Sequence, residues 1–474
     1  MIGGQGAFAP ERRLLTIGLL GLVTAAAFEG MAVPTVLPAM VTDLGGLDLY
    51  GWAFSAFWLT NIIGITLAGS DADRRGPGRA LAVGVVLFAA GMAVSGVANE
   101  MPVVIVGRAI QGFGSGAIGS VVYAAIARAY PASATPRMIA LTSSAWVVPG
   151  LIGPALAGWV TDTLGWRWVF LGIVPPVLVM GIAVYPQLAR LGAAQRSSVP
   201  MRSDARRGLD AVRLALGSTM LLAALTIGSL PLALLLVGAG GWLAVAALRH
   251  LLPPGTLRLR RGRPAVVAVV FGIAFAFFGT EAFVPLTVVD VRGGSVTFGG
   301  LALSAAAVTW TIGSWVQARA ATAGIRRTLV TSGAGLIGAG IVITALVLVP
   351  EVPVLVAALG WAVAGLGMGL AYSMLALMVL ETAVPGEEGF SSSALQLMFT
   401  LGTAFGAGVG GAVVALADAG TIPLPSAIGL LDLVMLVMAV AAIAVSLRVP
   451  RGPSARSTVT EIPASASALP LEHR

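Results

Sequence analysis

The sequence predicts an all-α polytopic membrane protein with fourteen membrane-spanning helices. Hydrophobic residues make up 57% of the 474 residues and charged residues only 10%, a composition that no soluble domain could keep in water. Apolar segments of about 20 residues, the length needed to cross a bilayer as a helix, recur along the whole chain. These runs are continuous, which excludes a β-barrel, because barrel strands are short and alternate polar with apolar residues.

The predicted spans follow one another with short connections. The first run resembles a signal peptide but extends to about Met40, so we predict an uncleaved first span. The pair at 213–230 and 232–249 is separated only by GSLPL, and one broken helix is the alternative. The fourteen spans lie near 14–38, 50–69, 80–98, 102–127, 138–160, 167–186, 213–230, 232–249, 265–289, 298–318, 328–349, 353–379, 390–416 and 426–447.

Arginine placement predicts the orientation of the chain. All 28 basic residues are arginine. With the N-terminus inside, 25 of them fall in inner segments, Arg167 and Arg292 in outer loops, and Arg108 within a span. This asymmetry follows the positive-inside rule and places both termini in the cytoplasm. The net charge of +8 therefore indicates a face near anionic lipid and excludes nucleic acid as the partner.

The spans group as six, two and six, with Arg-rich linkers around the central pair. We expect an N-terminal six-helix bundle over 1–186 and a C-terminal six-helix bundle over 265–448. The linkers and two extra helices occupy 187–264. The tail, 449–474, is rich in Ser and Pro and is expected to be disordered. Abundant Ala, Gly and Val without Lys suggests a bacterial protein, and hence the inner or plasma membrane.

The leading span of each six-helix half carries a deep carboxylate followed by Val-Pro. The first reads FEGMAVP and contains Glu29, and the second reads GTEAFVP and contains Glu281. Charged groups inside a membrane are costly and commonly mark ion or proton pathways, and two-half transporters bind near the midplane between the halves. Both residues are predicted to carry protons, and a hydrogen-bonded structural anchor is the alternative for each. Asp432, near the outer end of the last span, is expected to be structural.

Three further stretches carry motif-like patterns. GSDADRRGPGRA (69–80) is predicted to be a cytoplasmic loop with a turn at Gly76 and Gly78 and exchangeable ion pairs at Asp73 and Arg74. RAIQGFGSG places Arg108, which needs a carboxylate or carbonyl partner, on nearly the same helix face as Gln111. PGLIGPALAG (149–158) combines small residues with two prolines and predicts a flexible packing seam.

These stretches resemble the signature motifs of the major facilitator superfamily, in its fourteen-helix drug:proton antiporter branch. The cytoplasmic-loop motif matches Gly69, Asp73, Arg74 and Gly76, and the fourth-helix motif matches Arg108, Gln111 and Gly112. The fifth-helix antiporter motif matches Gly153, Pro154 and Gly158, and Gly150 lies beside it, but Pro149 and Ala157 stand where Gly is usual. The first-helix motif keeps its acid-to-proline spacing at Glu29 and Pro38, with Met31 and Pro34 replacing the usual residues. Gln317 replaces the acidic residue in the second half's loop.

The resemblance implies a major-facilitator fold and alternating access. Gly69, Asp73, Arg74 and Gly76 would latch one state, and Arg108 would tune proton release. The motif formed by Gly150, Gly153, Pro154 and Gly158 would favour export. The expected function is proton-coupled export of hydrophobic or cationic drug-like compounds by a monomer in contact with membrane lipids. Its apolar cavity would be lined by Phe28, Gln111, Trp146, Phe283 and Trp310.

Two other transport functions stay open, namely lipid or glycolipid export and, with few polar residues in the spans, proton-coupled solute uptake. A membrane enzyme would need clustered His, Asp, Glu or Lys at a membrane face. Only Glu381, Glu387 and Glu388 gather, without a neighbouring His. A sensor would usually append a soluble domain. The chain has no cysteine and both histidines fall in loops or the tail, so we expect no metal site and no cofactor beyond the proton gradient.

Overall fold

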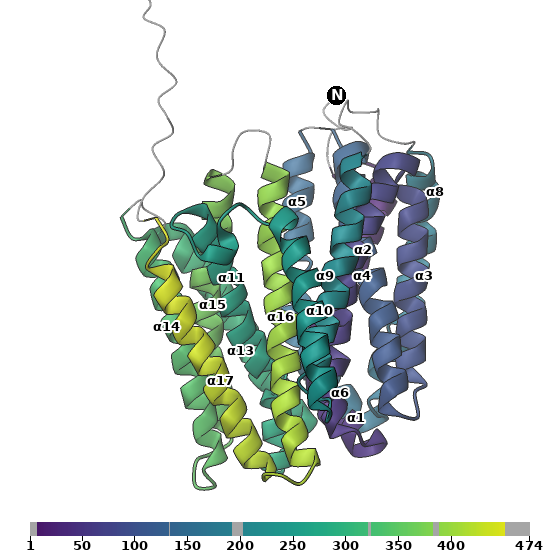
Figure 1. Ribbon diagram of the computed structural model, residues 1–474. Helices are drawn as coiled ribbons and strands as arrows, with labels where there is room; N and C mark the ends of the chain where they lie inside the picture. The colour runs from purple at the N-terminus through teal and green to yellow at the C-terminus, as the bar shows by residue number, and fades with distance from the viewer. Residues whose placement is uncertain (1–6, 132, 192–201, 321–323, 383–387, 451–474) are drawn as a thin grey trace, which may run out of the picture.

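The computed structural model describes residues 7–131, 133–191, 202–320, 324–382 and 388–450, and these residues form a bundle of long helices without a strand (Figure 1). Thirteen of the helices are long and apolar enough to cross a membrane. One further long helix, Arg202–Ala223, lies within the same bundle. This confirms the predicted all-α polytopic architecture. Of the predicted tail, 449–474, only residues 449 and 450 are described.

The N-terminal half crosses the bundle six times, with its fifth and sixth crossings each built from two helices. Its elements are α1 (Arg13–Leu44), η1 (Leu47–Leu49), α2 (Tyr50–Arg75), α3 (Pro77–Gly96), α4 (Met101–Ala129), α5 (Thr135–Ser144), α6 (Val147–Leu164), α7 (Arg167–Leu171) and α8 (Val174–Ala189).

The fifth crossing is broken where the sequence predicted one continuous span over 138–160. Helix α5 ends at Ser144 and α6 begins at Val147, with a turn at Ala145 and Trp146. Pro149 lies in the first turn of α6, where its missing N–H costs nothing. Further along a continuous helix, the same proline would remove a backbone hydrogen bond and clash with the preceding turn.

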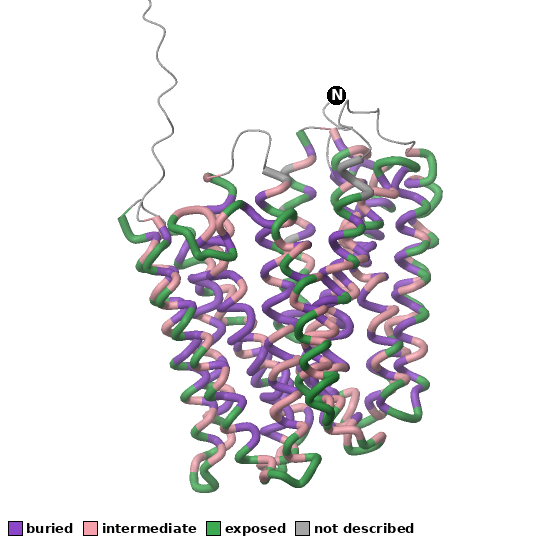
Figure 2. Tube along the Cα trace, in the orientation of Figure 1, coloured by how far each residue is buried: buried purple, intermediate pink, exposed green. Residues whose placement is uncertain are grey.

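The central pair consists of α9 (Arg202–Ala223) and α10 (Leu230–Leu251), which pack along each other. Two separate helices are therefore present rather than one broken helix. The predicted span 213–230 was misplaced, because α9 begins in the segment assigned to an Arg-rich linker. Its first turns carry the exposed arginines Arg206 and Arg207 and suit a membrane surface, whereas its later part is apolar. Figure 2 shows α10 largely exposed on the outside of the bundle.

The C-terminal half also crosses six times, and its first crossing is interrupted. Pro285 has no N–H to donate to the carbonyl of Glu281, and α11 ends at that residue. The elements are η2 (Thr256–Arg258), α11 (Arg263–Glu281), α12 (Val284–Leu286), the π-helix η3 (Thr287–Val291), α13 (Val296–Ala320), α14 (Arg326–Ala345), η4 (Leu346–Leu348), α15 (Leu355–Glu381), α16 (Glu388–Asp418) and α17 (Leu424–Ser446).

The two halves repeat one packing scheme. In the first half α4 packs on α2 and α3, α1 on α6 and α8, and α3 on α8. In the second half α15 packs on α13 and α14, α11 on α16 and α17, and α14 on α17. The contacts between the halves repeat as well, because α6 packs on α13 and α16 packs on α2. Helices α1 and α11, which carry the two echoed glutamates, occupy equivalent places.

The halves are joined near the end of the bundle away from the chain termini. Helix α1 begins and α17 ends at the same end (Figure 1). At the opposite end, the hydroxyl of Tyr50, the first residue of α2, donates to the carbonyl of Ala282 at 2.9 Å. One and a half turns further along α2, Ser55 donates to the carbonyl of Ala404 at 2.8 Å. The outer end, as the arginine distribution assigns it, is therefore closed.

Candidate functional site

An ion pair between α1 and α4 forms the centre of the candidate site. Nη1 of Arg108 contacts Oε1 of Glu29, and each side chain is only 1% exposed. From the sequence, Arg108 was expected to have a carboxylate or carbonyl partner, and Glu29 was an unexplained carboxylate inside a span. The structure brings the two together and buries both.

Arg108 is held from three further sides. Its Nε donates to the carbonyl of Ala53 on α2 at 2.9 Å, and Nη1 donates to Oε1 of Gln111 at 2.9 Å. Its guanidinium lies over the ring of Phe57, 4.4 Å from the ring centre, a geometry in which a cation is stabilised by the ring. Within the described residues, Oε2 of Glu29 and Nε2 of Gln111 are buried without a hydrogen-bond partner. One carboxylate oxygen of Glu29 is therefore bound to Arg108, and the other accepts no hydrogen bond within the described residues.

Glu281, the echo of Glu29, has a different environment. It is the last residue of α11 and only half-buried. Its Oε2 accepts one hydrogen bond, from Nε1 of Trp361 on α15 at 3.3 Å. Within the described part of the chain it has no ion pair, although an ion pair neutralises Glu29. The two glutamates that the sequence predicted to act alike therefore differ: Glu29 is fully buried in an ion pair, whereas Glu281 is half-buried and accepts one hydrogen bond.

Aromatic rings from four helices gather beside Glu281. Phe278 lies one turn before Glu281 on the same face of α11. It is 6.3 Å from Trp310 and 5.2 Å from Phe399, and Tyr372 is 6.1 Å from Trp310 and 5.0 Å from Phe399, measured between ring centres. All four rings are half-buried. The neighbouring ring of Phe277 stacks on Trp361, with ring centres 4.8 Å apart. We call Phe278, Trp310, Tyr372 and Phe399 the aromatic wall.

The other residues predicted to line a cavity are scattered. Phe28 is half-buried and lies against Gly153 of α6. Trp146 is 44% exposed at the break between α5 and α6. Phe283 is 1% exposed and stacks on Tyr50 with ring centres 5.0 Å apart, so it packs in the closed end. Gln111 is fully buried beside Arg108.

The small residues of the fifth-helix motif face two neighbouring helices. Gly150 and Gly153 lie against Met31 and Phe28 of α1. Pro154 and Gly158 lie against the backbone of α13 at Gly300 and Thr297. Helix α6 is therefore packed between α1 of its own half and α13 of the other half, as a packing seam requires.

The predicted loop over 69–80 is mostly helical. Helix α2 continues to Arg75, since no residue breaks it and its terminal arginines suit the helix dipole. The connection to α3 is Gly76 alone, whose φ of 93° favours glycine. Asp73 pairs with Arg128 of α4 at 2.7 Å, and Arg74 donates to the carbonyl of Ser70 at 3.2 Å. Gly69 lies against Ser120 of α4. These contacts stay within the N-terminal half.

The corresponding inner end of the C-terminal half uses different residues. Gln317, which stands in the place of Asp73, is buried in α13. Arg326 at the start of α14 forms an ion pair with Glu381 at the end of α15. Glu387 lies outside the described residues, so its relation to Glu381 stays a prediction.

Asp432 lies toward the outer end of α17 and is buried, at 6% exposed.

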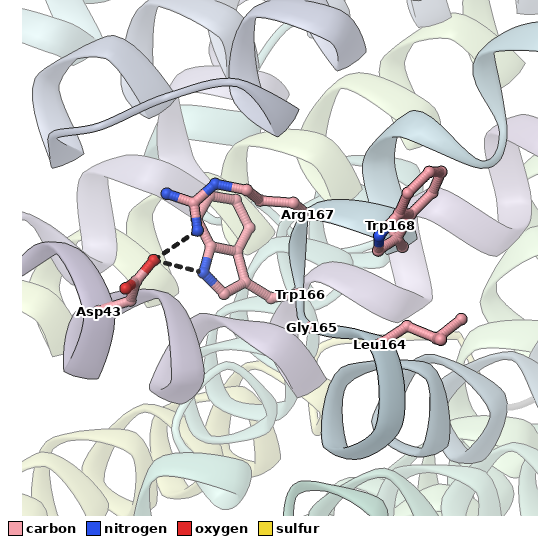
Figure 3. A pocket seen from close by; sticks show the side chains of 6 residues that line it. All are labelled: Asp43, Leu164, Gly165, Trp166, Arg167 and Trp168. Atoms are coloured by element: carbon pink, nitrogen blue, oxygen red, sulfur yellow. Dashed lines mark hydrogen bonds and ion pairs between the residues drawn. The ribbon is translucent and has the colours of Figure 1, made fainter.

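A surface pocket lies at the outer end, within the N-terminal half. Oδ2 of Asp43 accepts from Nη1 of Arg167 at 2.6 Å and from Nε1 of Trp166 at 3.1 Å (Figure 3). The contacts tie the end of α1 to the start of α7. The lining comprises Asp43, Leu164, Gly165, Trp166, Arg167 and Trp168, and it includes none of the predicted site residues.

Comparison with known proteins decides the family. Residues 18–407 match the family model described as Major Facilitator Superfamily, and these residues contain the Glu29–Arg108 pair, α6 and the aromatic wall. The chain belongs to the major facilitator superfamily. The resemblance to this superfamily is therefore confirmed, and the chain is a membrane transporter of that superfamily.

Relatives within the superfamily carry efflux names. The multidrug transporter protein MdtP of Bacillus subtilis (strain 168) is 27% identical over 416 residues, covering 85% of this chain and 75% of the relative. A protein of Mycobacterium tuberculosis (strain ATCC 25618 / H37Rv) named "Probable multidrug-efflux transporter Rv1634" is 27% identical over 427 residues, covering 86% and 88%.

Solved structures show the same fold. An auto-inhibited POT family peptide transporter matches with a TM-score of 0.65 at 16% identity, covering 92% of this chain and 97% of that chain. The human organic anion transporter MFSD10 (TETRAN) matches with a TM-score of 0.55 at 18% identity, covering 91% and 99%.

Several residues that position this major-facilitator site were missed by the sequence reasoning. Trp361, the donor to Glu281, lies within an ordinary apolar helix. Arg128, the partner of Asp73, lies in the last turn of α4. Tyr50 bonds to Ala282 and Asp162 bonds to Thr297 of the other half, and both lie at helix ends, where polar residues are common. A position at the boundary of a span was the available signal for the last three.

Proposed function

We propose that the chain is a proton-coupled exporter of hydrophobic or cationic compounds that works by alternating access. It would act as a monomer in the bacterial plasma membrane, with both termini cytoplasmic and lipids as neighbours. The proton gradient would drive it without a bound cofactor.

The proposed proton coupling rests on the Glu29–Arg108 pair. Both charges are removed from water, so their pairing is compulsory unless one of them is neutralised. A proton on the free oxygen of Glu29 would cancel the attraction to Arg108. Because Arg108 also holds the backbone of α2 through Ala53, protonation would alter the packing of α1, α2 and α4 together. A change of proton occupancy would then bias one arrangement of the N-terminal half over another.

The proposed substrate binding rests on Glu281 and the aromatic wall. A half-buried carboxylate without an ion pair in the described residues attracts cations, and the faces of four half-buried rings stabilise a delocalised positive charge. The same wall binds neutral apolar compounds by burial of their surface. The efflux names of the relatives favour drug-like compounds over a lipid or a nutrient.

Transport in inside-out vesicles tests the proposal. A pH gradient with an acidic lumen is imposed, and accumulation of a fluorescent lipophilic cation is followed for the wild type, Glu29→Gln and Glu281→Gln. Glu351→Gln, a matched change at an exposed residue of the outer end, is the control. We expect gradient-dependent uptake in the wild type and the control, and none in Glu29→Gln.

Two results would count against the proposal. Uptake in Glu29→Gln at the wild-type rate would remove Glu29 from proton coupling. No uptake by folded wild type would remove lipophilic cations as substrates. Lipid or glycolipid export would then become the leading function, because it would use the same apolar surface.

A further inference from the structure

A carboxylate of one half contacts the first turn of a helix in the other half. Oδ2 of Asp162 accepts hydrogen bonds from the backbone N–H of Thr297 at 3.0 Å and from its hydroxyl at 2.6 Å. Asp162 lies in the last turn of α6, which ends at Leu164, and Thr297 is the second residue of α13. The contact therefore lies at the outer end, where the two halves meet.

The geometry is that of a helix cap supplied by another part of the chain. The first four N–H groups of a helix have no partner within it, and a carboxylate beside them satisfies a donor and suits the helix dipole. Usually the cap comes from the residue just before the helix. Helix α13 has such a cap too, because Oγ of Ser295 accepts from the N–H of Phe298 at 3.1 Å.

The two caps have different consequences when the halves separate. Ser295 moves with α13 and keeps the helix start intact in every state. Asp162 belongs to α6 and can cap α13 only while the halves touch. Its two hydrogen bonds are therefore gained on closing and lost on opening, so their free energy acts on the closing equilibrium and not on the helix itself.

The surrounding packing fixes this contact in the closed state. Gly158 lies against the backbone of Thr297, and Gly300 against the carbonyl of Pro154. These small residues let α6 and α13 meet backbone to backbone and bring Asp162 to the helix start. Asp162 itself is exposed, so water can solvate it again when the halves part. A gate that must open repeatedly needs such a low cost of separation.

We propose that Asp162 closes the outer gate of the transporter by capping helix α13 of the opposite half. The proposal uses the orientation given above but does not depend on the identity of the substrate. Because the native chain has no cysteine, a single introduced cysteine can report on the gate. Ser55→Cys is suitable, since Ser55 is fully buried and bonded to Ala404 across the halves.

The experiment measures the rate at which a membrane-impermeant maleimide, added outside intact cells, labels Ser55→Cys. Asp162→Ala is the test variant. Asp48→Ala removes an exposed acid of η1 at the same end and is the matched control. Leu164→Cys, at a position 61% exposed, separately reports that this end faces outward. Thr297→Val removes only the hydroxyl donor, and Thr297→Ser keeps it.

We expect Asp162→Ala to raise the labelling rate about fivefold, which is about 1 kcal/mol at 1.4 kcal/mol per factor of ten. Thr297→Val should raise it less, and Asp48→Ala and Thr297→Ser should match the parent. Equal rates in Asp162→Ala and the parent would overturn the proposal, as would an equal rise in Asp48→Ala. An unlabelled Leu164→Cys would overturn the outward placement of the gate. If Asp162→Ala does not fold, Thr297→Val decides.

Discussion

Arg108 and Glu29 pair across α4 and α1 with both side chains almost completely removed from solvent. Such a pair is weak evidence for stability, because desolvation of two charges offsets most of their attraction. It agrees better with the proposed proton coupling, since charged groups inside a membrane commonly mark ion or proton pathways.

Removing the arginine should destabilise the fold as well as abolish transport. Arg108→Ala leaves Glu29 buried without its partner, a change that costs about 3–5 kcal/mol in buried pairs. Thermal unfolding in detergent, followed by tryptophan fluorescence, should show a lower Tm. Arg74→Ala, at an exposed arginine, is the control. A Tm equal to that of the control would mean that the pair is structurally dispensable.

The double variant Glu29→Gln/Arg108→Gln should recover part of that loss. It places two neutral amides where two charges stood, so no unpaired charge remains buried. We expect a Tm above that of Arg108→Ala, with transport still absent. A Tm below that of the single variant would show that the charges themselves hold the N-terminal half together.

Two glycines of α4 should respond oppositely to alanine. A Cβ at Gly112 would collide with the carbonyl of Phe57 on α2, whereas a Cβ at Gly119 meets nothing within 4 Å. Gly112→Ala should therefore abolish the folded protein or lower its Tm strongly. Gly119→Ala should be neutral or stabilising by up to about 1 kcal/mol, the helix-propensity difference. Size-exclusion profiles and Tm values measure both, and equal behaviour would refute the close approach of α2 to α4.

The hydrogen bond from Trp361 should tune cation binding at Glu281. Trp361→Phe keeps a ring on Phe277 but removes the N–H that Glu281 accepts from. We expect tetraphenylphosphonium to bind more weakly, because the lost N–H no longer stabilises the charged form of the Glu281 carboxylate. Trp242→Phe, at a residue 70% exposed on α10, controls for the loss of an indole. Unchanged equilibrium binding would separate Glu281 from the substrate.

The hydroxyl of Tyr50 should contribute to closure of the outer end independently of Asp162. Tyr50→Phe removes the bond to the carbonyl of Ala282 while leaving the ring stacked on Phe283. A net loss of about 1 kcal/mol corresponds to roughly fivefold faster labelling of the Ser55→Cys reporter. Tyr185→Phe, at an exposed tyrosine, should not change the rate. Slower or unchanged labelling in Tyr50→Phe would contradict a closing role.

The sequence predicts the architecture well because the bilayer constrains the architecture strongly. Span length and the placement of arginine are direct consequences of burying helices in hydrocarbon, and the helices follow them. The glutamate followed closely by Val-Pro recurs in the first span of each half, with three intervening residues after Glu29 and two after Glu281. Three boundaries were wrong. Helix α9 begins well before the apolar run, Pro149 breaks the fifth crossing, and α2 continues through the charged stretch before Gly76. In each case a polar or proline residue is tolerated at a helix end, which hydropathy does not register.

The site was predictable in its charges and not in its partners. An arginine and a glutamate inside the membrane each need a partner that offsets their charge, and Arg108 and Glu29 form an ion pair with each other. The difference between Glu29 and Glu281 could not be read from their matching motifs. It depends on α4 presenting Arg108 while α15 presents Trp361, and that is a property of packing between distant segments. Asp162 was overlooked because its partner is a helix start in the other half.

Proton release on substrate binding tests the central claim most directly. Purified wild type and Glu29→Gln are placed in weakly buffered detergent solution with a pH-sensitive dye, and tetraphenylphosphonium is added. If Glu29 exchanges its proton as substrate binds, the wild type acidifies the solution, and Glu29→Gln, with binding confirmed, does not. Equal acidification by both proteins would contradict the account, and proton coupling would then belong to another carboxylate.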